Sequence, residues 1–375
     1  MLKVMTILGT RPEFIKMSRV IAAFDQHTTN LIVHTGQNYD YELNQIFFDD
    51  LGIRKPDFFL EAVGANAAQT IGRVIEKVDA VMEKTKPEAV LIYGDTNSSM
   101  AVIAAKRRKI PVFHMEAGNR CFDPHVPEEL NRKVIDHLSD INLTLTEQAR
   151  HNLIQEGLPA ERIIKTGSHM GEVLKYYATQ IAQSSVLTKL GLDVRGYFLV
   201  SAHREENVDD AKNLGDLLQT LSALVKTYNK PIIVSTHPRT QERLKTIGVD
   251  QLDKRIRFLK PFGFFDYVKL QMEALCVLSD SGTITEESSL LNLCAVNIRN
   301  THEHPEGNDA GTLIMAGLKA ERVVEAVRIT LAQQSTFVPD PIRDYGSLEV
   351  SGKILRCVLS YVDYVNRYVW RKTGI

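Results

Sequence analysis

The sequence predicts an α/β protein with two doubly wound, Rossmann-like domains, each built on a mainly parallel sheet. Short apolar runs rich in Val and Ile alternate with stretches of helical periodicity, which is typical of βαβ units. The alternation restarts after a polar stretch at residues 182–187, so the second half repeats the architecture of the first. The length of 375 residues also exceeds a single domain of about 150 residues.

Five short and almost uninterrupted apolar runs in the first half are predicted to be strands that are buried on both faces. These are Lys3–Leu8, Leu31–Thr35, Ala89–Tyr93, Pro111–Met115 and Ile141–Leu145. Between them, apolar residues recur at helical spacing and predict core-facing helices. The two stripes are Phe14, Met17, Ile21 and Phe24, and Ile71, Val74, Ile75, Val78 and Met82.

Five further runs in the second half predict a second sheet. They are Tyr197–Ser201, Pro231–Ser235, Arg255–Leu259, Ala274–Ser279 and Cys294–Ile298. The clearest amphipathic helix of this half spans residues 214–225, where leucines recur on one face. We place the domain boundary near residues 167–173, with a first domain at 1–168. Ligands of such sheets bind at the carboxyl ends of the strands, so we expect a site in the cleft between the domains.

Composition limits the class of partner. The 45 Lys and Arg residues balance 46 Asp and Glu residues, which argues against nucleic acid and favours a small molecule. The four cysteines lie far apart, no signal segment opens the chain, and no apolar run reaches the ~18 residues that cross a bilayer. We therefore expect a cytoplasmic protein that contacts no membrane. The sequence contains no G-x-G-x-x-G after the first strand and no Walker A motif, and His302 with His304 lacks a third metal ligand.

Polar residues that follow the strands of the first half are the candidates for chemistry. Arg11 and Lys16 lie at the predicted start of a helix, where a phosphate would be favoured, although they could equally be solvated surface cations. Asp95 follows the third strand and could act on a substrate, but capping of the next helix is the favoured interpretation.

Two more carboxylates follow the next strand of the first half. Glu116 ends that strand, and Glu128 opens the following helix four residues before Arg132, with which it could simply form an ion pair. Three carboxylates at one sheet edge would repel one another and raise at least one pKa, as proton transfer at carbon requires.

The second half offers groups suited to a diphosphate. His203 directly follows its first strand and could stabilise leaving phosphate charge, although a structural histidine is the commoner case. Ser281, Gly282 and Thr283 join a strand to a helix and could bind a pyrophosphate, or simply begin the helix as a capping box. One turn later, Glu286 or Glu287 could accept hydrogen bonds from ribose hydroxyls.

Taken together and in this order, the motifs resemble those of the non-hydrolysing UDP-N-acetylglucosamine 2-epimerase family. The matching segments are GTRPE-x-IK, HTGQ, GDTNS, H-x-EAG-x-R, PEE-x-NR, HRE-x-N, THPR, DSG-x-x-x-EE and HPEG. The resemblance covers nearly the whole chain and implies a glycosyltransferase-B-like fold. It also implies a second domain at 169–355 and a C-terminal segment at 356–375. In this segment, a helix over Val358–Trp370 returns to the first domain.

The resemblance further implies an isomerase that removes the proton from carbon 2 of a UDP-aminosugar, expels UDP from carbon 1, and adds UDP back after protonation on the opposite face. Such an enzyme supplies surface polysaccharide biosynthesis and needs no cofactor and no metal. By motif position, Asp95, Glu116 and Glu128 are acid/base candidates, and the choice between base and acid is open. The implied substrate and UDP ligands are Arg11, Lys16, Arg132, His203, Ser281, Gly282, Thr283 and Glu287. We also expect a homodimer.

Several segments differ from the best-known members of that family. The segments at 34–52, 116–123 and 280–289 are more similar to the branch that forms UDP-N-acetyl-L-fucosamine from a 6-deoxy-L-talo sugar. In the best-known members, an extra substrate molecule acts as an activator beside a Gln-His-Arg motif, and this chain has Gln37-Asn38-Tyr39 there. In a second motif, Glu-Arg-Pro-Glu, His304 replaces the arginine. Because His304 is no permanent cation, we expect a weaker or pH-dependent substrate contact there.

Three rival functions remain open. A glycosyltransferase can share the fold, a hydrolysing epimerase would release free sugar, and a sensor would bind the UDP-sugar without turnover.

Overall fold

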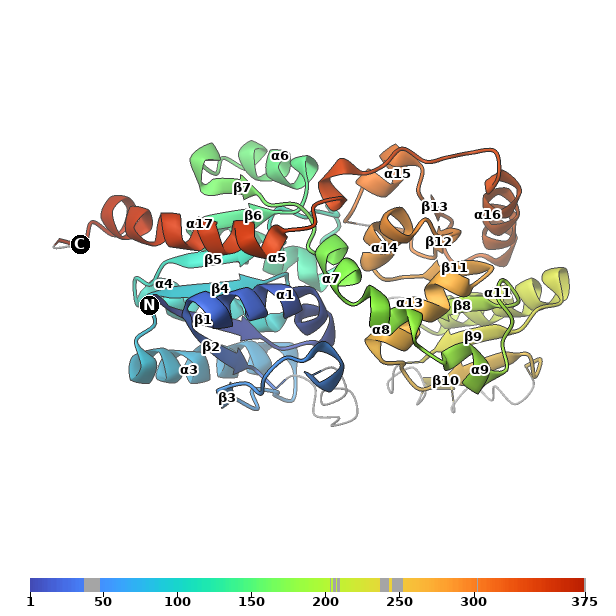
Figure 1. Ribbon diagram of the computed structural model, residues 1–375, viewed down its shortest axis with the longest axis horizontal. Coiled ribbons are helices and arrows are strands. Elements are labelled where there is room, and N and C mark those ends of the chain that lie inside the picture. The colour runs from blue at the N-terminus through green and yellow to red at the C-terminus, as the bar shows by residue number, and fades with distance from the viewer. Residues whose placement is uncertain are drawn as a thin grey trace. The chain divides into compact units, whose positions relative to one another are not determined.

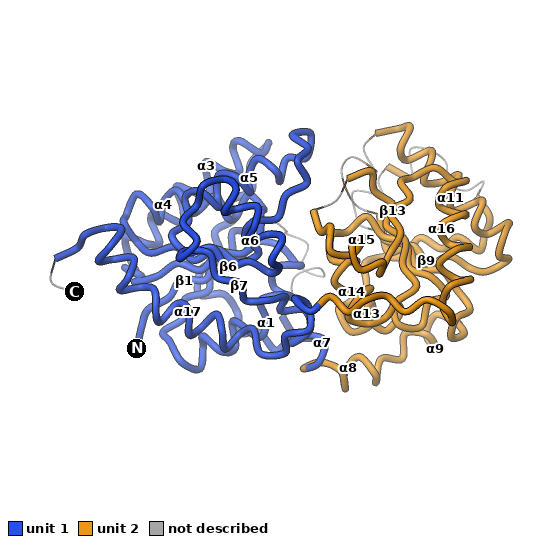
Figure 2. Tube along the Cα trace, turned by 90° about the horizontal axis from the view of Figure 1, so that it is seen from above, with its two compact units in different colours: residues 1–175, 343–375 blue, residues 176–342 orange. Residues whose placement is uncertain are grey.

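The computed structural model describes residues 1–36, 48–202, 204, 207, 210–236, 243–244, 252–301 and 303–373. The chain forms two compact units (Figure 2). Unit 1 comprises Met1–Lys175 with Arg343–Ile375, and unit 2 comprises Tyr176–Ile342. No helix among the residues described is long and apolar enough to span a membrane.

Unit 1 is built on a seven-stranded parallel sheet with the order β3-β2-β1-β4-β5-β6-β7 (Figure 1). Its strands are β1 (Lys3–Leu8), β2 (Thr29–His34), β3 (Phe58–Phe59), β4 (Ala89–Tyr93), β5 (Val112–Met115), β6 (Ile141–Thr144) and β7 (Ile163–Lys165). All neighbouring strands are parallel. The carboxyl ends of the strands therefore lie along one edge, and the loops that leave this edge, together with the helices that follow them, carry the predicted polar residues of unit 1.

Helices cover both faces of this sheet. They are α1 (Arg11–His27), α3 (Ala67–Thr85), α4 (Val102–Arg107), α5 (Pro127–Leu138), α6 (Glu147–Gln155), α7 (Met170–Tyr176) and α17 (Val350–Tyr364), with the short turns η1 (Asn97–Ala101), η2 (Ala160–Arg162), η4 (Arg343–Tyr345) and η5 (Val365–Val369). Helices α3, α4 and α5 contribute to one core layer. Helix α17 packs on α1, and both lie in front of the sheet in Figure 1.

Unit 2 repeats this plan with a six-stranded parallel sheet of order β10-β9-β8-β11-β12-β13. The strands are β8 (Phe198–Ser201), β9 (Ile232–Ser235), β10 (Ile256–Leu259), β11 (Cys276–Ser279), β12 (Ala295–Asn297) and β13 (Ile314–Met315). The helices are α8 (Ala178–Ala182), α9 (Val186–Leu190), α11 (Ala211–Tyr228), α13 (Phe264–Glu273), α14 (Thr283–Leu291), α15 (Glu306–Ala310) and α16 (Ala320–Gln333). Helices α11 and α16 pack in one core layer, and α9, α13 and α14 contribute to the other.

The two-sheet α/β prediction is confirmed, and all ten predicted strands are present with small differences at their ends. The sequence reading missed β3, β7 and β13, which have only two or three residues and therefore no recognisable apolar run. Helix α17 begins at Val350 rather than at Val358, because the polar residues 351–353 continue its first turn.

The predicted helical stripes face the core. Phe14, Met17, Ile21 and Phe24 are buried on α1, and so is the leucine face of α11. On α3, Val74, Val78 and Met82 are buried, whereas Ile71 and Ile75 are only partly buried at the rim of the same layer.

Candidate functional site

The strands β4 and β5 end side by side, and each is followed by a residue in the left-handed backbone conformation. Gly94 and Glu116 both have φ of +63°, and Tyr93 is opposite Met115 in the register. A glycine adopts this conformation freely, but a glutamate does so at a cost. Such strain in a non-glycine residue is concentrated at functional sites, where the turn directs a side chain. Here it directs the Glu116 carboxylate.

Two donors hold one oxygen of Glu116. The Lys16 ammonium lies 2.8 Å from Oε2, and the Tyr93 hydroxyl donates to the same oxygen. Among the residues that the structure describes, no donor reaches Oε1, and the side chain of Glu116 is 14% exposed. The carboxylate is thus fixed at one oxygen, while the other has lone pairs that a ligand can reach.

Asp95 is also held at one oxygen, in this case by the Arg132 guanidinium. Arg132 donates from Nε to Oδ2 of Asp95 at 2.7 Å and from a terminal nitrogen to Glu129 at 3.0 Å. Asn131 fixes the backbone by donating to the Asp95 carbonyl at 2.9 Å. No donor from the described part of the chain reaches Oδ1 of Asp95, whose side chain is 25% exposed.

Asp95 is therefore not a helix cap, contrary to the favoured sequence interpretation. Thr96 occupies the cap position of η1, and its hydroxyl accepts a hydrogen bond from the Ser98 backbone. Because Asp95 lies one residue before the cap, its side chain is available for the ion pair with Arg132.

The carboxylate with a raised pKa is Glu13 on α1. Burial raises its pKa to about 7, against the opposing hydrogen bonds from the Thr96 hydroxyl and the backbone N–H groups of Gly9 and Thr10. These bonds connect the ends of β1 and β4, so Glu13 holds the turn that contains Asp95 against the start of α1. We expected repulsion among the site carboxylates to raise a pKa; here the cause is desolvation.

A buried ion network supports the turns behind these carboxylates. His114 on β5 has Nδ1 2.8 Å from Asp136 and Nε2 2.8 Å from the Gly94 carbonyl. The ring thus connects Asp136 to the turn after β4. Arg120 also donates to Asp136 at 2.7 Å. Burial alone would raise the pKa of Asp136, but the His114 and Arg120 donors outweigh it and lower that pKa.

The remaining predicted residues of unit 1 lie on the same helices. Arg11 is the first residue of α1 and is half-buried. Glu128 is half-buried in the first turn of α5. Arg132 forms ion pairs with Asp95 and Glu129.

In unit 2, the turn after β11 leads directly into α14. Ser281 and Thr283 have their hydroxyl oxygens 2.9 Å apart, and Gly282 lies between them. A β-carbon at Gly282 would lie 2.7 Å from Glu303 Oε1 and 3.3 Å from His304 Nε2. A side chain here would therefore force Glu303 or His304 to shift.

Glu303, which follows β12, joins two arginines. Arg204 donates to Oε1 at 2.8 Å and the buried Arg299 to Oε2 at 2.7 Å. Asp280, at the end of β11, accepts from the Arg204 backbone and from Asn207, both at 3.0 Å. The segments after β8, β11 and β12 are thereby tied together.

Glu287 is buried on α14 and accepts a hydrogen bond from Gln271 at 2.6 Å. His203, His302 and the segment Gln37-Asn38-Tyr39 lie outside the residues described. Within the described ranges, no group of three or more His, Cys, Asp or Glu side chains could hold a metal ion.

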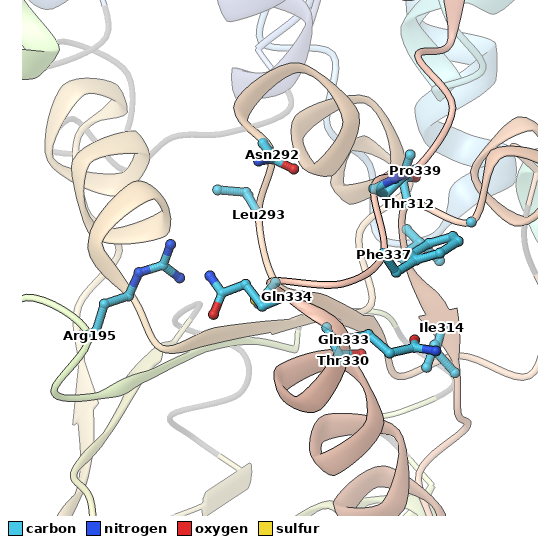
Figure 3. A pocket seen from close by; sticks show the side chains of 13 residues that line it. Arg195, Asn292, Leu293, Thr312, Ile314, Thr330, Gln333, Gln334, Phe337 and Pro339 are labelled. Atoms are coloured by element: carbon cyan, nitrogen blue, oxygen red, sulfur yellow. The ribbon is translucent and has the colours of Figure 1, made fainter.

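A separate pocket of unit 2 lies at the opposite end of its strands (Figure 3). Its lining includes Arg195, which precedes β8, and Cys294, which precedes β12. The Arg195 guanidinium donates to the Ala274 carbonyl at 3.0 Å. None of the predicted site residues lines this pocket.

Sequence reasoning missed three side chains that hold the site together: Tyr93, Glu13 and Glu129. Each lies inside a recognised segment, namely the end of a strand, the first turn of a helix and the pair Glu128-Glu129. The strand-end position of Tyr93 was the available signal, since such side chains face the same edge as Glu116.

The family model "UDP-N-acetylglucosamine 2-epimerase" matches residues 22–359. A UDP-N-acetylglucosamine 2-epimerase of Methanocaldococcus jannaschii is 33% identical over 374 residues, which cover 97% of this chain and all of that protein. A UDP-2,3-diacetamido-2,3-dideoxy-D-glucuronate 2-epimerase of Pseudomonas aeruginosa is 34% identical and covers 94% of this chain and 98% of its own length.

Solved structures agree with these relatives. A UDP-N-acetylglucosamine 2-epimerase from Rickettsia bellii superposes with a TM-score of 0.94 at 61% identity, over 99% of this chain and 100% of that one. The M. jannaschii enzyme in complex with UDP-GlcNAc and UDP gives a TM-score of 0.90 at 32% identity, over 96% and 100% of the two chains. A glycosyltransferase from Rickettsia africae, with a TM-score of 0.58 at 12% identity, shares the fold alone.

Proposed function

Because the chain belongs to the UDP-N-acetylglucosamine 2-epimerase family of isomerases, we propose that it inverts carbon 2 of a UDP-2-acetamido sugar without hydrolysing it. UDP is eliminated and added back. The product would serve surface polysaccharide biosynthesis. The glycosyltransferase alternative is not favoured, since the relatives with substantial identity are epimerases.

The observation that supports this proposal is that two carboxylates of unit 1 are each held at one oxygen. Glu116 has one oxygen held by Lys16 and Tyr93, and Asp95 has one oxygen held by Arg132. Each keeps a second oxygen for a ligand. Inversion at carbon requires one group that removes a proton and another that delivers one to the opposite face, and two fixed carboxylates meet that requirement.

The reaction balances without a redox partner. One carboxylate takes the proton from carbon 2, the electron pair of that C–H bond forms the double bond between carbons 1 and 2, and the bond from carbon 1 to the diphosphate oxygen breaks. The resulting 2-acetamidoglycal takes a proton at the other face of carbon 2, and the diphosphate oxygen bonds again to carbon 1. Glu128 is a third acid/base candidate.

The leaving diphosphate carries negative charge and needs cations and polar donors. We assign Arg11, Lys16, Arg132 and His203 to this task. Ser281, Gly282 and Thr283 would bind the diphosphate at the start of α14, and Glu287 would bind the ribose. Glu287 already accepts a hydrogen bond from Gln271, which would orient its carboxylate.

The sugar can be UDP-N-acetylglucosamine itself or the 6-deoxy-L-talo derivative whose 2-epimer is UDP-N-acetyl-L-fucosamine. The name of the P. aeruginosa relative indicates a different 2-acetamido sugar. Family membership therefore does not select the sugar. The resemblance of residues 34–52, 116–123 and 280–289 to the L-fucosamine branch supports the second substrate.

Incubation in deuterated water tests the proposal. We expect the purified protein, given UDP-N-acetylglucosamine or the 6-deoxy-L-talo sugar without an acceptor, to place deuterium on carbon 2 and to form the 2-epimer, as seen by NMR. A glycosyltransferase would show no exchange, and a hydrolysing enzyme would release free sugar and UDP. Either result with both sugars would refute the proposal.

A variant distinguishes catalysis from simple binding. Asp95→Asn should abolish exchange at carbon 2 but retain affinity for UDP in titration calorimetry. Asp79→Asn, which removes a surface carboxylate paired with Arg108 on the outside of unit 1, is the matched control and should exchange normally. Normal exchange by Asp95→Asn would remove Asp95 from the acid/base set.

A further inference from the structure

Tyr93 has a position that none of the proposed roles uses. It is the last residue of β4 and is buried. The Lys16 ammonium lies 5.6 Å from the centre of its ring. The His169 ring meets it edge-on, with centres 5.3 Å apart and an interplanar angle of 87°. The ring is thus fixed from two sides, and its hydroxyl is directed to Glu116 Oε2.

We propose that Tyr93 is a positioning residue that assigns the two oxygens of Glu116 different tasks. The Tyr93 hydroxyl and the Lys16 ammonium hold Oε2, so that Oε1 is the oxygen that exchanges a proton with carbon 2 of the sugar. This inference rests on the proposed epimerase function.

The arrangement suits a group that must be both base and acid in turn. When Glu116 is ionised, Oε2 accepts from both donors. When Oε1 has taken a proton, Oε2 is the carbonyl oxygen of a carboxylic acid and still accepts from both. Neither hydrogen bond has to break during the cycle, so the carboxyl group keeps its orientation. The Tyr93 proton itself is not transferred.

The two donors contribute differently. Lys16 supplies charge, because its ammonium lies 2.8 Å from Oε2. Tyr93 supplies direction, because its ring cannot turn between Lys16 and His169 without losing both contacts. In the described part of the chain, the titratable side chains that contact Glu116 or the Tyr93 ring include Lys16 and His169.

Replacement of the hydroxyl is the test. Tyr93→Phe keeps the ring against His169 and removes only the donor. Because a hydrogen bond to a charged group is lost, we expect kcat/KM to fall about 10- to 100-fold. We expect the loss in kcat, with the KM of the sugar little changed, because the misdirected carboxylate impairs proton transfer rather than binding. UDP affinity and the thermal midpoint should change little.

The matched control is Tyr197→Phe in unit 2. Tyr197 is also buried, and its hydroxyl donates to the Leu270 carbonyl at 2.7 Å. This variant loses a comparable hydrogen bond in a core, so we expect a loss of stability with an unchanged kcat. The same fall of kcat in both variants would contradict a specific role of Tyr93.

A double-mutant cycle separates positioning from general damage. If Tyr93 acts through Glu116, then Tyr93→Phe should have no further effect on the residual carbon 2 exchange of Glu116→Gln. If the two substitutions instead lowered the exchange rate by the product of their separate effects, the inference would be overturned. A wild-type kcat/KM for Tyr93→Phe would overturn it as well. Absence of exchange in the wild-type protein would instead refute the epimerase function, so the two failures are distinguishable.

Discussion

Arg132 is the side chain on which two carboxylates of the site depend. Its Nε donates to Asp95 and a terminal nitrogen donates to Glu129, and the residue is only 3% exposed. Glu129 in turn accepts from the backbone of Cys121 and Phe122, at 3.1 and 3.2 Å. The planar guanidinium therefore connects the turn after β4 with the loop after β5.

A lysine cannot reproduce these two hydrogen bonds in the same geometry, because its single ammonium group would have to donate to both carboxylates. We expect Arg132→Lys to lower kcat/KM for epimerisation about 10- to 100-fold, measured by NMR of the C2 epimers. Arg322→Lys, at the exposed pair with Glu325, is the control and should be neutral. Wild-type kinetics for Arg132→Lys would show that charge alone suffices at this position.

Glu13 makes stability depend on pH near neutrality. Burial raises its pKa to about 7 from an ordinary value of 4.5, so the folded protein binds the proton more tightly than the unfolded chain does. The contribution of Glu13 to the free energy of unfolding is therefore highest below pH 4.5 and falls as pH rises to 7. The fall is on the order of 3 kcal/mol.

Glu13→Gln cannot titrate and should lack this dependence. We expect the thermal midpoint of the wild type to decline relative to that of Glu13→Gln between pH 5 and pH 7, measured by calorimetry at matched ionic strength. Parallel midpoints over that range would mean that Glu13 remains ionised throughout.

The residue scale also shows where sequence reasoning stops. The site carboxylates Asp95 and Glu116 were found because each follows a strand, and Lys16 because it lies near the start of a helix, whereas Arg132 was assigned through the family resemblance. Their pairing could not be predicted, since Lys16 and Glu116 are 100 residues apart in the chain and meet only through the sheet order. For Asp95, local evidence alone favoured a cap, because a local motif cannot reveal a partner on another helix.

At the scale of elements, the parallel strands were predictable and their short neighbours were not. Strands such as β4, with five buried residues, have a continuous apolar run. Strands β3 and β13 have two residues each and exist because a longer neighbour offers free backbone groups. Their formation depends on tertiary contacts that no local pattern contains.

The start of α14 provides a test at this scale. Gly282 has an ordinary right-handed backbone with φ of −63°, so only space forbids a side chain there. Gly282→Ala should push Glu303 and His304 away and weaken UDP binding about tenfold, measured by titration calorimetry. Gly215→Ala is the matched control, since no atom lies within 4 Å of its added β-carbon.

Gly215 lies within α11, where alanine is the better helix former. The control should therefore keep its UDP affinity and gain up to about 1 kcal/mol of stability. Unchanged UDP affinity in Gly282→Ala would show that the turn before α14 does not contact the diphosphate.

In the whole molecule, 45 Lys and Arg residues balance 46 Asp and Glu residues, and opposite charges are also paired within the two groups of site residues. Lys16 pairs with Glu116, Arg132 with Asp95 and Glu129, and Arg204 and Arg299 share Glu303. The sequence predicts a local excess of cations for a diphosphate. The structure gives two of these cations, Lys16 and Arg132, a carboxylate that fixes their position, so a nearly neutral chain can present oriented charge.

The last residues of the chain complete unit 1 rather than unit 2. Helix α17 packs on α1, the helix that carries Arg11 and Lys16, and Ser351 at its start donates to Glu172 on α7 from its backbone at 2.8 Å. Ile354 is fully buried on this helix, whereas Leu359 is 50% exposed. The stability of α1, and with it the position of Lys16, thus depends on residues more than 300 positions away in the chain.

This dependence predicts which unit responds to a cavity in α17. Ile354→Ala should cost about 2–5 kcal/mol of stability, and hydrogen exchange should show the loss in the strands and helices of unit 1, including α1, with unit 2 unaffected. Leu359→Ala removes a similar volume from the exposed side of the same helix and should leave exchange unchanged. If Ile354→Ala accelerated exchange equally in β8–β13, the two units would unfold as one, and the C-terminal helix would stabilise the whole chain rather than the unit that carries Glu116.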